Sequence, residues 1–286
     1  MTEAPFVTYD VFTDRRFGGN PLAVVIDATK VPEAMFQTVA REFGYSETTF
    51  VLPPEDPARD AKVRIFTPTM ELPFAGHPTV GTALALHEAG RAGDDMVLEL
   101  GVGPIPVTVR DGVARFTTRV PLSTSPGPNA AAVAGMVGLA QTSVRIDRHP
   151  PEVAGVGLPF LLAELGGDAD LVAAYPDLDA FRRAAGEEAE RLGLLVYLRD
   201  GPSIRARMFA PLGGVMEDPA TGSAAAALTA YLGRLDGRSQ HFEIVQGVEM
   251  GRPSLILTEV TVEGGAPVEV AVSGRAVRVM EGRIAV

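Results

Sequence analysis

The 286-residue chain contains no cysteine and no tryptophan, and its only lysines are Lys30 and Lys62. Without cysteine the chain can form no disulfide, no thiolate metal site and no cysteine nucleophile. Neither lysine lies in a motif, so a Schiff base with pyridoxal phosphate is not expected. No cluster of His, Asp and Glu has the spacing of metal ligands. The sequence therefore disfavours a metal site and a pyridoxal phosphate cofactor.

Positive charge and long apolar runs are also scarce. There are 25 Lys and Arg residues against 36 Asp and Glu, for a net charge of −11, which disfavours nucleic acid or an anionic membrane as a partner. No apolar run approaches the roughly 20 residues of a membrane span. The N-terminal MTEAPFVTYD lacks the basic and apolar regions of an export signal. We therefore expect a cytoplasmic protein.

What the chain does contain is a stretch of small apolar residues behind a polar turn, within Phe209–Leu232. Asp218 precedes a proline, and an Asp-Pro pair favours a helix start in which the carboxylate accepts free N–H groups. Gly222 and Ser223 would lie in the first turn, where backbone N–H groups can receive an anion. Ala224–Leu232 carries no charge, which predicts a helix buried on all sides.

The same arrangement occurs earlier in the chain. Val63–Pro68 (VRIFTP) matches Ala206–Pro211 (ARMFAP), and His77–Ala83 (HPTVGTA) matches Asp218–Ala224 (DPATGSA). Each copy is followed by an apolar helix. These matches indicate a twofold duplication rather than a solenoid, which needs more and shorter copies.

Each half is expected to run strand, helix, strand, strand, turn and buried helix. A helical spacing of apolar residues predicts a helix over Val31–Phe43 that ends at Gly44. Asp111-Gly112 is typical of a hairpin turn. Further predicted elements are the strands Phe6–Phe12, Leu22–Ile26, Phe50–Leu52, Met96–Leu100, Ile105–Val109, Val113–Thr117, Leu194–Leu198, Phe242–Gln246, Ser254–Thr258, Val268–Ser273 and Ala276–Val286, and an amphipathic run over Leu178–Leu192.

The predicted fold is α+β, with two similar lobes. Each lobe is a mostly antiparallel sheet or open barrel wrapped round a central buried helix. We expect an N-terminal lobe over residues 1–122, a C-terminal lobe over 130–270, and a terminal strand over 271–286 that is free to return to the N-terminal lobe. Pro121–Asn129, rich in Pro and Gly, reads as the linker between the lobes.

Two helix N-termini that face one cleft would hold a small carboxylate through the backbone N–H groups of Gly76–Gly81 and Ala220–Ser223. The same groups would stabilise the enolate-like charge that forms when a neighbouring C–H loses its proton. Glu47, in a polar turn ahead of a buried strand, is the candidate base, and we expect desolvation to raise its pKa. Its counterpart in the second half lies near Gly193, so the base is not duplicated. On the residues alone, a role for Glu47 at a strand end is an equal alternative.

Four motifs in order, GGNPLAVV, SETTFVL, FTPTMELPFAGHPTVGTA and EDPATGSAAAAL, resemble the phenazine-biosynthesis isomerase (PhzF-like) family. The resemblance runs over nearly the whole chain. It implies the diaminopimelate-epimerase-like fold, an active site between two similar domains, no cofactor and commonly a homodimer.

Carried over by motif, the resemblance implies that Glu47 is the general acid/base. It implies that His77 and Asp218 line the substrate and assist proton handling. Gly76, Gly222 and Ser223 would hold the substrate carboxylate, and Asn20 would lie near the site.

The function expected from the motifs is a PhzF-like isomerase that moves a proton next to a carboxyl group of a small, cyclic or open-chain acid. Two alternatives stay open. One is an epimerase or racemase that uses Glu47 with Asp218 or His77 as a second base, since the two-cysteine version of this chemistry is excluded. The other is a protein that binds a small acid without turning it over.

Overall fold

The computed structural model describes residues 3–185 and 193–286. The chain divides into two compact units. Unit 1 comprises the described residues of Met1–Thr117 together with Val272–Val286, and unit 2 comprises those of Thr118–Ala271. The C-terminal residues therefore belong to the same unit as the N-terminal ones. Among the described residues, no helix is both long enough and apolar enough to cross a membrane.

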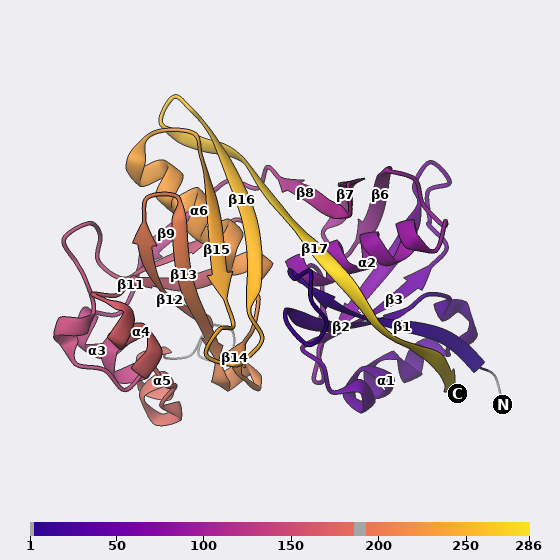
Figure 1. Ribbon diagram of the computed structural model, residues 1–286, viewed down its shortest axis with the longest axis horizontal. Coiled ribbons are helices and arrows are strands. Elements are labelled where there is room, and N and C mark those ends of the chain that lie inside the picture. Colours follow the sequence, from indigo (N-terminus) through magenta and orange to yellow (C-terminus); the bar gives the residue numbers. More distant parts are fainter. Residues whose placement is uncertain (1–2, 186–192) are drawn as a thin grey trace. The chain divides into compact units, whose positions relative to one another are not determined.

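Unit 1 is a mixed sheet around one buried helix (Figure 1). Its elements are β1 (Glu3–Val11), β2 (Asn20–Val25), the 3₁₀ turns η1 (Ala28–Lys30) and η2 (Glu33–Met35), α1 (Phe36–Phe43), β3 (Glu47–Leu52), β4 (Ala61–Phe66), β5 (Glu71–Leu72), α2 (Gly76–Glu88), β6 (Asp95–Leu100), β7 (Gly103–Arg110), β8 (Val113–Thr118) and the C-terminal part of β17 (Ala266–Ala285). Most pairings are antiparallel, while β2–β3 and β4–β6 are parallel.

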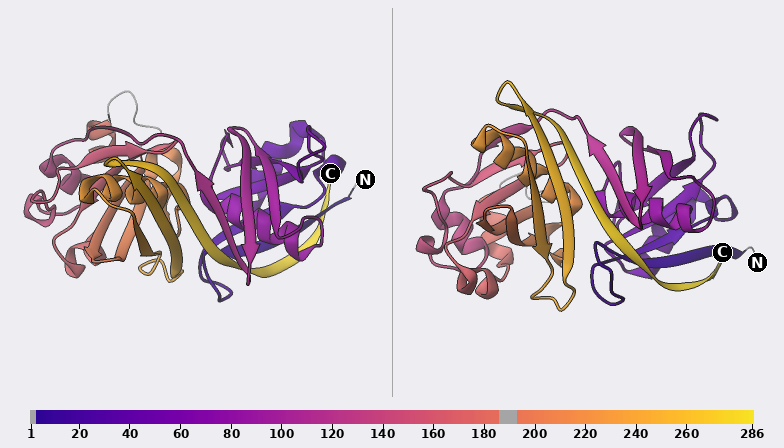
Figure 2. Two further views of the ribbon diagram at one scale, coloured as in Figure 1. Left: turned by 90° about the horizontal axis from the view of Figure 1, so that it is seen from above. Right: turned by 45° about the horizontal axis from the view of Figure 1, so that its top comes forward.

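The sheet of unit 1 closes on itself because β17 pairs with both β1 and β8. The register of β1 and β17 runs from Glu3 opposite Ala285 to Val11 opposite Ala276, so the two chain ends lie side by side (Figure 2). Helix α2 packs against β1, β2, β3 and β7, and every residue from Gly76 to Leu86 is buried. This confirms the buried helix expected after His77.

Unit 2 repeats the plan. Its elements are β9 (Ser123–Pro126), α3 (Ala130–Met136), η3 (Gln141–Ser143), β10 (Glu152–Gly155), β11 (Pro159–Glu164), α4 (Asp168–Ala173), α5 (Leu178–Ala185), β12 (Gly193–Asp200), β13 (Ser203–Ala210), η5 (Pro211–Gly213), β14 (Val215–Asp218), α6 (Gly222–Asp236), β15 (Gln240–Gln246), β16 (Ser254–Glu263) and the N-terminal part of β17. The parallel pairs β11–β12 and β13–β15 stand where unit 1 has β2–β3 and β4–β6.

Helix α6 is the counterpart of α2 in unit 2. It is buried over Ala224–Gly233, as the absence of charge predicted, and it packs against β10, β11, β15 and β16. The fold is therefore α+β, with two similar lobes that each wrap a mostly antiparallel sheet round a central helix.

The helix expected over Val31–Phe43 begins later than predicted. The segment starts as two 3₁₀ turns, and the regular helix covers only Phe36–Phe43. Val31 is extended, with φ −103° and ψ 124°, because the proline that follows it disfavours the helical conformation. The predicted end is confirmed, since Gly44 adopts the left-handed conformation with φ 66°. Of the run Leu178–Leu192, α5 covers Leu178–Ala185, and residues 186–192 lie outside the described residues.

Two other boundaries were wrong. The segment Pro121–Asn129, expected as the linker, belongs to unit 2: Ser123–Pro126 forms β9 and pairs with β10, and Asn129 caps α3 through its side chain. The predicted break between the last two strands does not exist either, since β17 runs unbroken from Ala266 to Ala285. Gly274, which lies between the two predicted strands, allows close packing: a Cβ there would lie 2.3 Å from the Phe12 ring.

The hairpin expected at Asp111-Gly112 is confirmed. It joins β7 to β8, and both residues have positive φ, 52° and 72°. Two positive φ angles define the type I′ turn, whose twist matches that of the strands it joins.

Candidate active site

Two strand ends place Asn20 and Glu47 near each other in unit 1. Asn20 is the first residue of β2 and Glu47 the first of β3. The two strands are parallel, with Leu22 opposite Glu47, so both begin at the same edge of the sheet. The Asn20 side chain is fully buried, and the Glu47 side chain is 15% exposed. Glu47 is therefore turned away from bulk water.

His77 reaches the same place from α2, of which it is the second residue. Its Nδ1 lies 3.3 Å from Oε2 of Glu47 and 3.3 Å from Nδ2 of Asn20. The structure thus brings together three of the predicted site residues from three elements of one unit. Gly76, the first residue of α2, precedes His77 in the sequence and is also buried.

The environment of His77 keeps its imidazole neutral. Burial lowers the pKa of His77 to about 3, and interaction with the backbone of Pro21 opposes this shift only in part. The other ring nitrogen, Nε2, is buried and has no hydrogen-bond partner in the part of the chain that the structure describes. A buried polar atom without a partner is uncommon in folded proteins and is typical of a ligand site.

Backbone N–H groups complete this end of α2. The Thr79 N–H and hydroxyl both bond to the Ala75 carbonyl, so the helical ladder begins at Thr79. Pro78 has no N–H, and the N–H groups of Gly76 and His77 precede the ladder. The first turn of a helix has no intrahelical acceptor for such groups, which makes it a suitable place for an anion.

Unit 2 assembles the second set of predicted residues at the start of α6. Asp218 ends β14 and is 6% exposed. The Thr221 hydroxyl donates to Oδ2 of Asp218 at 2.5 Å. Gly222 and Ser223 are the first two residues of α6, and the first ladder bond runs from the Ala225 N–H to the Thr221 carbonyl.

Asp218 itself is not the N-cap that the Asp-Pro pair suggested. Thr221 holds that position, and α6 begins at Gly222, four residues after Asp218. The carboxylate of Asp218 accepts from the hydroxyl of the capping residue, Thr221. The helix of unit 1 differs, because there the matching residue, His77, lies within the helix.

Comparison with known proteins decides the family. The sequence pattern described as Phenazine biosynthesis-like protein (PhzC-PhzF) matches residues 9–282. The chain belongs to this family.

Relatives agree with this assignment to the PhzC-PhzF family. An uncharacterized isomerase of Mesorhizobium japonicum is 39% identical over 306 residues, covering 99% of each chain. The trans-2,3-dihydro-3-hydroxyanthranilate isomerase of Pseudomonas fluorescens is 37% identical and covers 98% of each chain. The protein described here is an isomerase.

Solved structures agree on the fold. A PhzF-family phenazine biosynthesis protein of Bacillus anthracis superposes with a TM-score of 0.89 at 24% identity, over the whole of both chains. A hydroxyproline epimerase of Agrobacterium vitis superposes with a TM-score of 0.64 at 17% identity, over 100% of this chain and 94% of that one. These likenesses establish the diaminopimelate-epimerase-like architecture.

Near the candidate site lies a residue that the sequence analysis missed. Gln246, 1% exposed at the end of β15, donates from Nε2 to the Asp218 carbonyl at 2.7 Å, and its Oε1 accepts from the Thr221 N–H at 3.2 Å. It holds the turn between β14 and α6. Gly247 follows, and a Cβ there would lie 2.7 Å from the Pro219 carbonyl oxygen. No motif marks Gln246, because its role depends on strand register.

The register also supports the asymmetry expected of this PhzF-like chain. Glu47 lies opposite Leu22 across the parallel pair β2–β3, and Gly193 lies opposite Phe160 across β11–β12. Unit 2 therefore has glycine where unit 1 has its carboxylate. A Cβ at Gly193 would meet the Phe160 ring at 3.1 Å, so the position in unit 2 has little room for a side chain.

No three His, Cys, Asp or Glu side chains of residues 3–185 and 193–286 are grouped so that they could hold an ion. That the enzyme uses no cofactor stays a prediction.

Proposed function

We propose that this isomerase moves a proton next to a carboxyl group of a small acid, with Glu47 as the general acid/base. The observation that carries the proposal is the 3.3 Å contact between Glu47 Oε2 and the Nδ1 of a buried His77. Glu47 takes a proton from the substrate carbon and returns it at another atom on the same face. A positioned carboxylate is a suitable group for both steps.

A neutral His77 suits this role. A charged imidazolium 3.3 Å from the carboxylate would stabilise the ionised form and make Glu47 a weaker base. The neutral ring has a lone pair on Nδ1, which accepts from the Asn20 amide and can also take up the proton of the carboxylic acid form of Glu47. We assign His77 the role of positioning Glu47 and assisting the proton transfer, with Asn20 beside the same ring nitrogen.

Anion binding is assigned to the helix starts. We propose that Gly76 in unit 1, and Gly222 and Ser223 in unit 2, bind the substrate carboxylate, and that Asp218 assists proton handling. Support comes from their positions in the first turns of α2 and α6 and at the end of β14. N–H groups that are fixed before the reaction can stabilise the enolate-like charge as it forms, without rearranging.

Epimerisation with His77 as the second base is disfavoured by geometry. Two-base epimerisation needs one group on each face of the reacting carbon, with that carbon between them. The atoms of Glu47 and His77 are 3.3 Å apart, which leaves no room for a carbon between them. A second base at Asp218 stays an open alternative.

The substrate class we propose is a small cyclic carboxylic acid. Trans-2,3-dihydro-3-hydroxyanthranilate, the compound in the name of the Pseudomonas fluorescens relative, is the first to test. The homodimer and the cytoplasmic location expected from the sequence also stay proposals. Light scattering of the purified protein at twice the chain mass would support the dimer, and a single-chain mass would contradict it.

The decisive experiment measures deuterium incorporation from heavy water into bound acids, with wild type and Glu47→Gln compared side by side. The amide keeps the shape of the side chain and removes its basicity. We expect the variant to fold and to bind ligand as wild type does, while exchange falls by about 10²- to 10⁴-fold.

Glu42→Gln is the matched control, since Glu42 is an exposed residue of α1 and its substitution should leave exchange unchanged. Exchange that survives in Glu47→Gln would refute the assignment of the base. Unfolding of that variant would show that Glu47 is structural. A wild-type protein that binds an acid and exchanges none of its protons would favour the binding-only alternative.

A further inference from the structure

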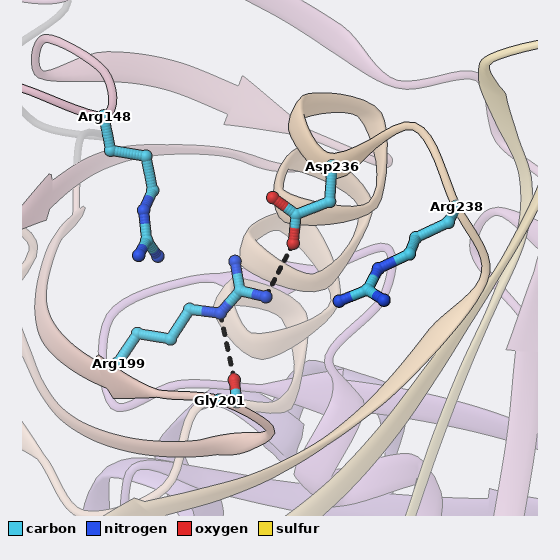
Figure 3. Close-up of a pocket in the computed structure, with 5 residues that line it drawn as sticks. All are labelled: Arg148, Arg199, Gly201, Asp236 and Arg238. Atoms are coloured by element: carbon cyan, nitrogen blue, oxygen red, sulfur yellow. Dashed lines mark hydrogen bonds and ion pairs between the residues drawn. The ribbon is translucent and has the colours of Figure 1, made fainter.

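A cavity of about 390 Å³ in unit 2 is lined by three arginines and a single carboxylate (Figure 3). Arg148 precedes β10, Arg199 lies near the end of β12, and Arg238 follows α6, whose last residue is Asp236. Gly201 is the remaining lining residue. The chain as a whole carries a net charge of −11, so a cavity with this excess of positive charge stands out.

Arg199 is held rigidly at the centre of the cavity. Its Nη2 donates to Oδ2 of Asp236 at 2.6 Å, and its Nε donates to the Gly201 carbonyl at 3.0 Å. Gln240 accepts a further hydrogen bond at 3.2 Å, and the guanidinium lies 5.0 Å from the centre of the Phe242 ring. Arg199 and Asp236 therefore neutralise each other.

Asp236 stays ionised in this setting. Burial acts to raise its pKa, but hydrogen bonds from Arg199 and Gln240, together with the charges of Arg199 and Arg148, shift the pKa below its ordinary value. The negative charge of Asp236 is therefore compensated by the positive charge of Arg199.

The other two arginines are not balanced in the same way. Arg148 forms an ion pair with the buried Glu164, at 3.7 Å between Nε and Oε2, which is longer than a hydrogen bond. The Arg238 guanidinium has no ion-pair partner among the described residues. In Figure 3, Arg148 and Arg238 stand on opposite sides of the Arg199–Asp236 pair.

A second cavity of about 310 Å³ adjoins the first and shares Arg199, Gly201 and Arg238 with it. It adds the side chains of Ser239, Gln240 and His241. Hydroxyl, amide and imidazole groups are all able to bond to oxygen atoms of an anion. Together the two cavities are large enough for a metabolite that extends beyond its charged group.

This cavity is distinct from the candidate active site. Asp236 ends α6, whereas Gly222 and Ser223 begin it. With a rise of about 1.5 Å per residue, the helix separates its two ends by roughly 20 Å.

We propose that the cavity binds a phosphoryl group, as inorganic phosphate or as a small phosphate ester. Arg148 and Arg238 come from separate segments and flank the neutralised Arg199–Asp236 pair. A tetrahedral phosphate presents oxygens in several directions and can accept from two guanidinium forks at once through one compact group, whereas each planar carboxylate of a diacid such as succinate matches one fork.

A purely structural role for these arginines predicts a different result. Cations near a helix C-terminus interact favourably with its last carbonyl groups and with the helix dipole. If Arg238 serves only the end of α6, the cavity has no preference for phosphate, and added anions act through ionic strength alone.

The test is calorimetric titration of the full-length protein at low ionic strength with inorganic phosphate, glycerol 3-phosphate and succinate, against sodium chloride of matched ionic strength. We expect saturable binding of phosphate or of its ester, and weaker binding of succinate. Tighter binding of glycerol 3-phosphate than of phosphate would identify the ligand as an ester, and equal binding would identify the phosphoryl group alone as the ligand.

Arg238→Gln should weaken this binding about tenfold, as expected for the loss of one charge-assisted contact. Arg183→Gln is the matched control, because Arg183 is an exposed arginine of α5 and its loss changes the net charge equally. The proposal is overturned if wild type shows no saturable phosphate or ester binding, if succinate binds as tightly as the phosphates, or if the two variants bind alike.

Discussion

Burial keeps the imidazole of His77 neutral, and this makes the stability of the protein depend on pH. Its pKa is lowered from 6.5 to about 3 in the folded protein. Below pH 6.5 the unfolded chain takes up a proton that the folded chain does not. The free energy of unfolding should therefore fall as the pH drops from 6.5 towards 3, by about 1.4 kcal/mol per pH unit from this residue. Denaturant unfolding across this range measures it.

The matching variant is His77→Gln, which cannot titrate. Burial also lowers the pKa of His149, so that residue contributes in the same direction and stays in both proteins. The difference between wild type and variant isolates His77. Equal pH dependence in the two proteins would show that the His77 ring is accessible to protons in the folded state.

Arg207 offers a test of a buried charge. Its Nε and Nη2 donate to both oxygens of Glu217 at 2.8 Å, and its Nη1 donates to the carbonyls of Leu171, Val172 and Ala174, where α4 ends. Replacing Arg207 by Leu leaves a largely buried carboxylate and three carbonyls without their donor. We expect a loss of about 3–5 kcal/mol in the free energy of unfolding, measured by chemical denaturation.

Arg182→Leu is the control for this loss. Arg182 pairs with Asp179 at 2.9 Å, but both side chains are more than half exposed. An exposed pair contributes about 0–1 kcal/mol. Similar effects of the two substitutions would mean that burial of the Arg207–Glu217 pair adds nothing to its contribution.

At the scale of single residues, the sequence indicated the groups of unit 1 well and those of unit 2 less well. Asn20, Glu47 and His77 each stand in a short motif, and the structure places all three together. Gln246 could not be found in this way. Its contact with the turn after Asp218 depends on which residue of β15 lies next to β13, and only the assembled sheet determines that register.

Among the elements, α2 depends on a glycine for its close approach to the sheet. A Cβ on Gly81 would lie 2.6 Å from Cδ2 of Leu22 and 2.7 Å from Cγ2 of Val11. Both neighbours are fully buried, so neither can move freely. Gly81→Ala should cost about 1–3 kcal/mol through overpacking, measured by denaturant unfolding.

Gly135→Ala is the contrasting substitution. Gly135 also lies in a helix, α3, but it is exposed and a Cβ there would meet nothing within 4 Å. Alanine has the higher helix propensity, so this change should leave stability unchanged or raise it by up to about 1 kcal/mol. A loss of stability at Gly135 equal to that at Gly81 would rule out crowding as the cause.

An element could be predicted when its own residues determine it, and could not when it depends on contacts with distant parts of the chain. The buried helices α2 and α6 were predicted because their uncharged sequences allow no exposed face. The start of α1 was misplaced because one proline outweighed the apolar spacing around it. Strand β9 was missed because its sequence favours a loop, and it is a strand only through pairing with β10.

At the scale of the whole chain, the two halves resemble each other more closely in their strand pairing than in their sequences. The parallel pairs β2–β3 and β4–β6 recur as β11–β12 and β13–β15, and each unit closes round one buried helix. The repeated sequence motifs predicted two similar lobes with a central buried helix, but not the parallel pairs. They did not predict the unbroken length of β17, in which Gly274 lies between the two predicted strands and packs closely against Phe12.

Unit 1 should depend on the C-terminal end of β17 for its stability. Residues from Ala276 to Ala285 pair along the whole of β1, and Ile284 and Val286 pack against a buried cluster that includes Phe36 and Phe50. Deleting residues 280–286 would leave much of β1 as an unpaired sheet edge and expose part of that cluster to water.

Limited proteolysis read by mass spectrometry tests this dependence, with unit 2 of the same molecule as the internal control. Local opening that costs only a few kcal/mol of free energy is enough to let a protease reach the chain. We expect the first cuts of the shortened chain to fall in residues 3–117, and those of wild type to be slower there. Unchanged cleavage of residues 3–117 would mean that β1 and the apolar cluster hold unit 1 together without the C-terminal end of β17. That end of β17 would then add little to the stability of the unit that carries Glu47.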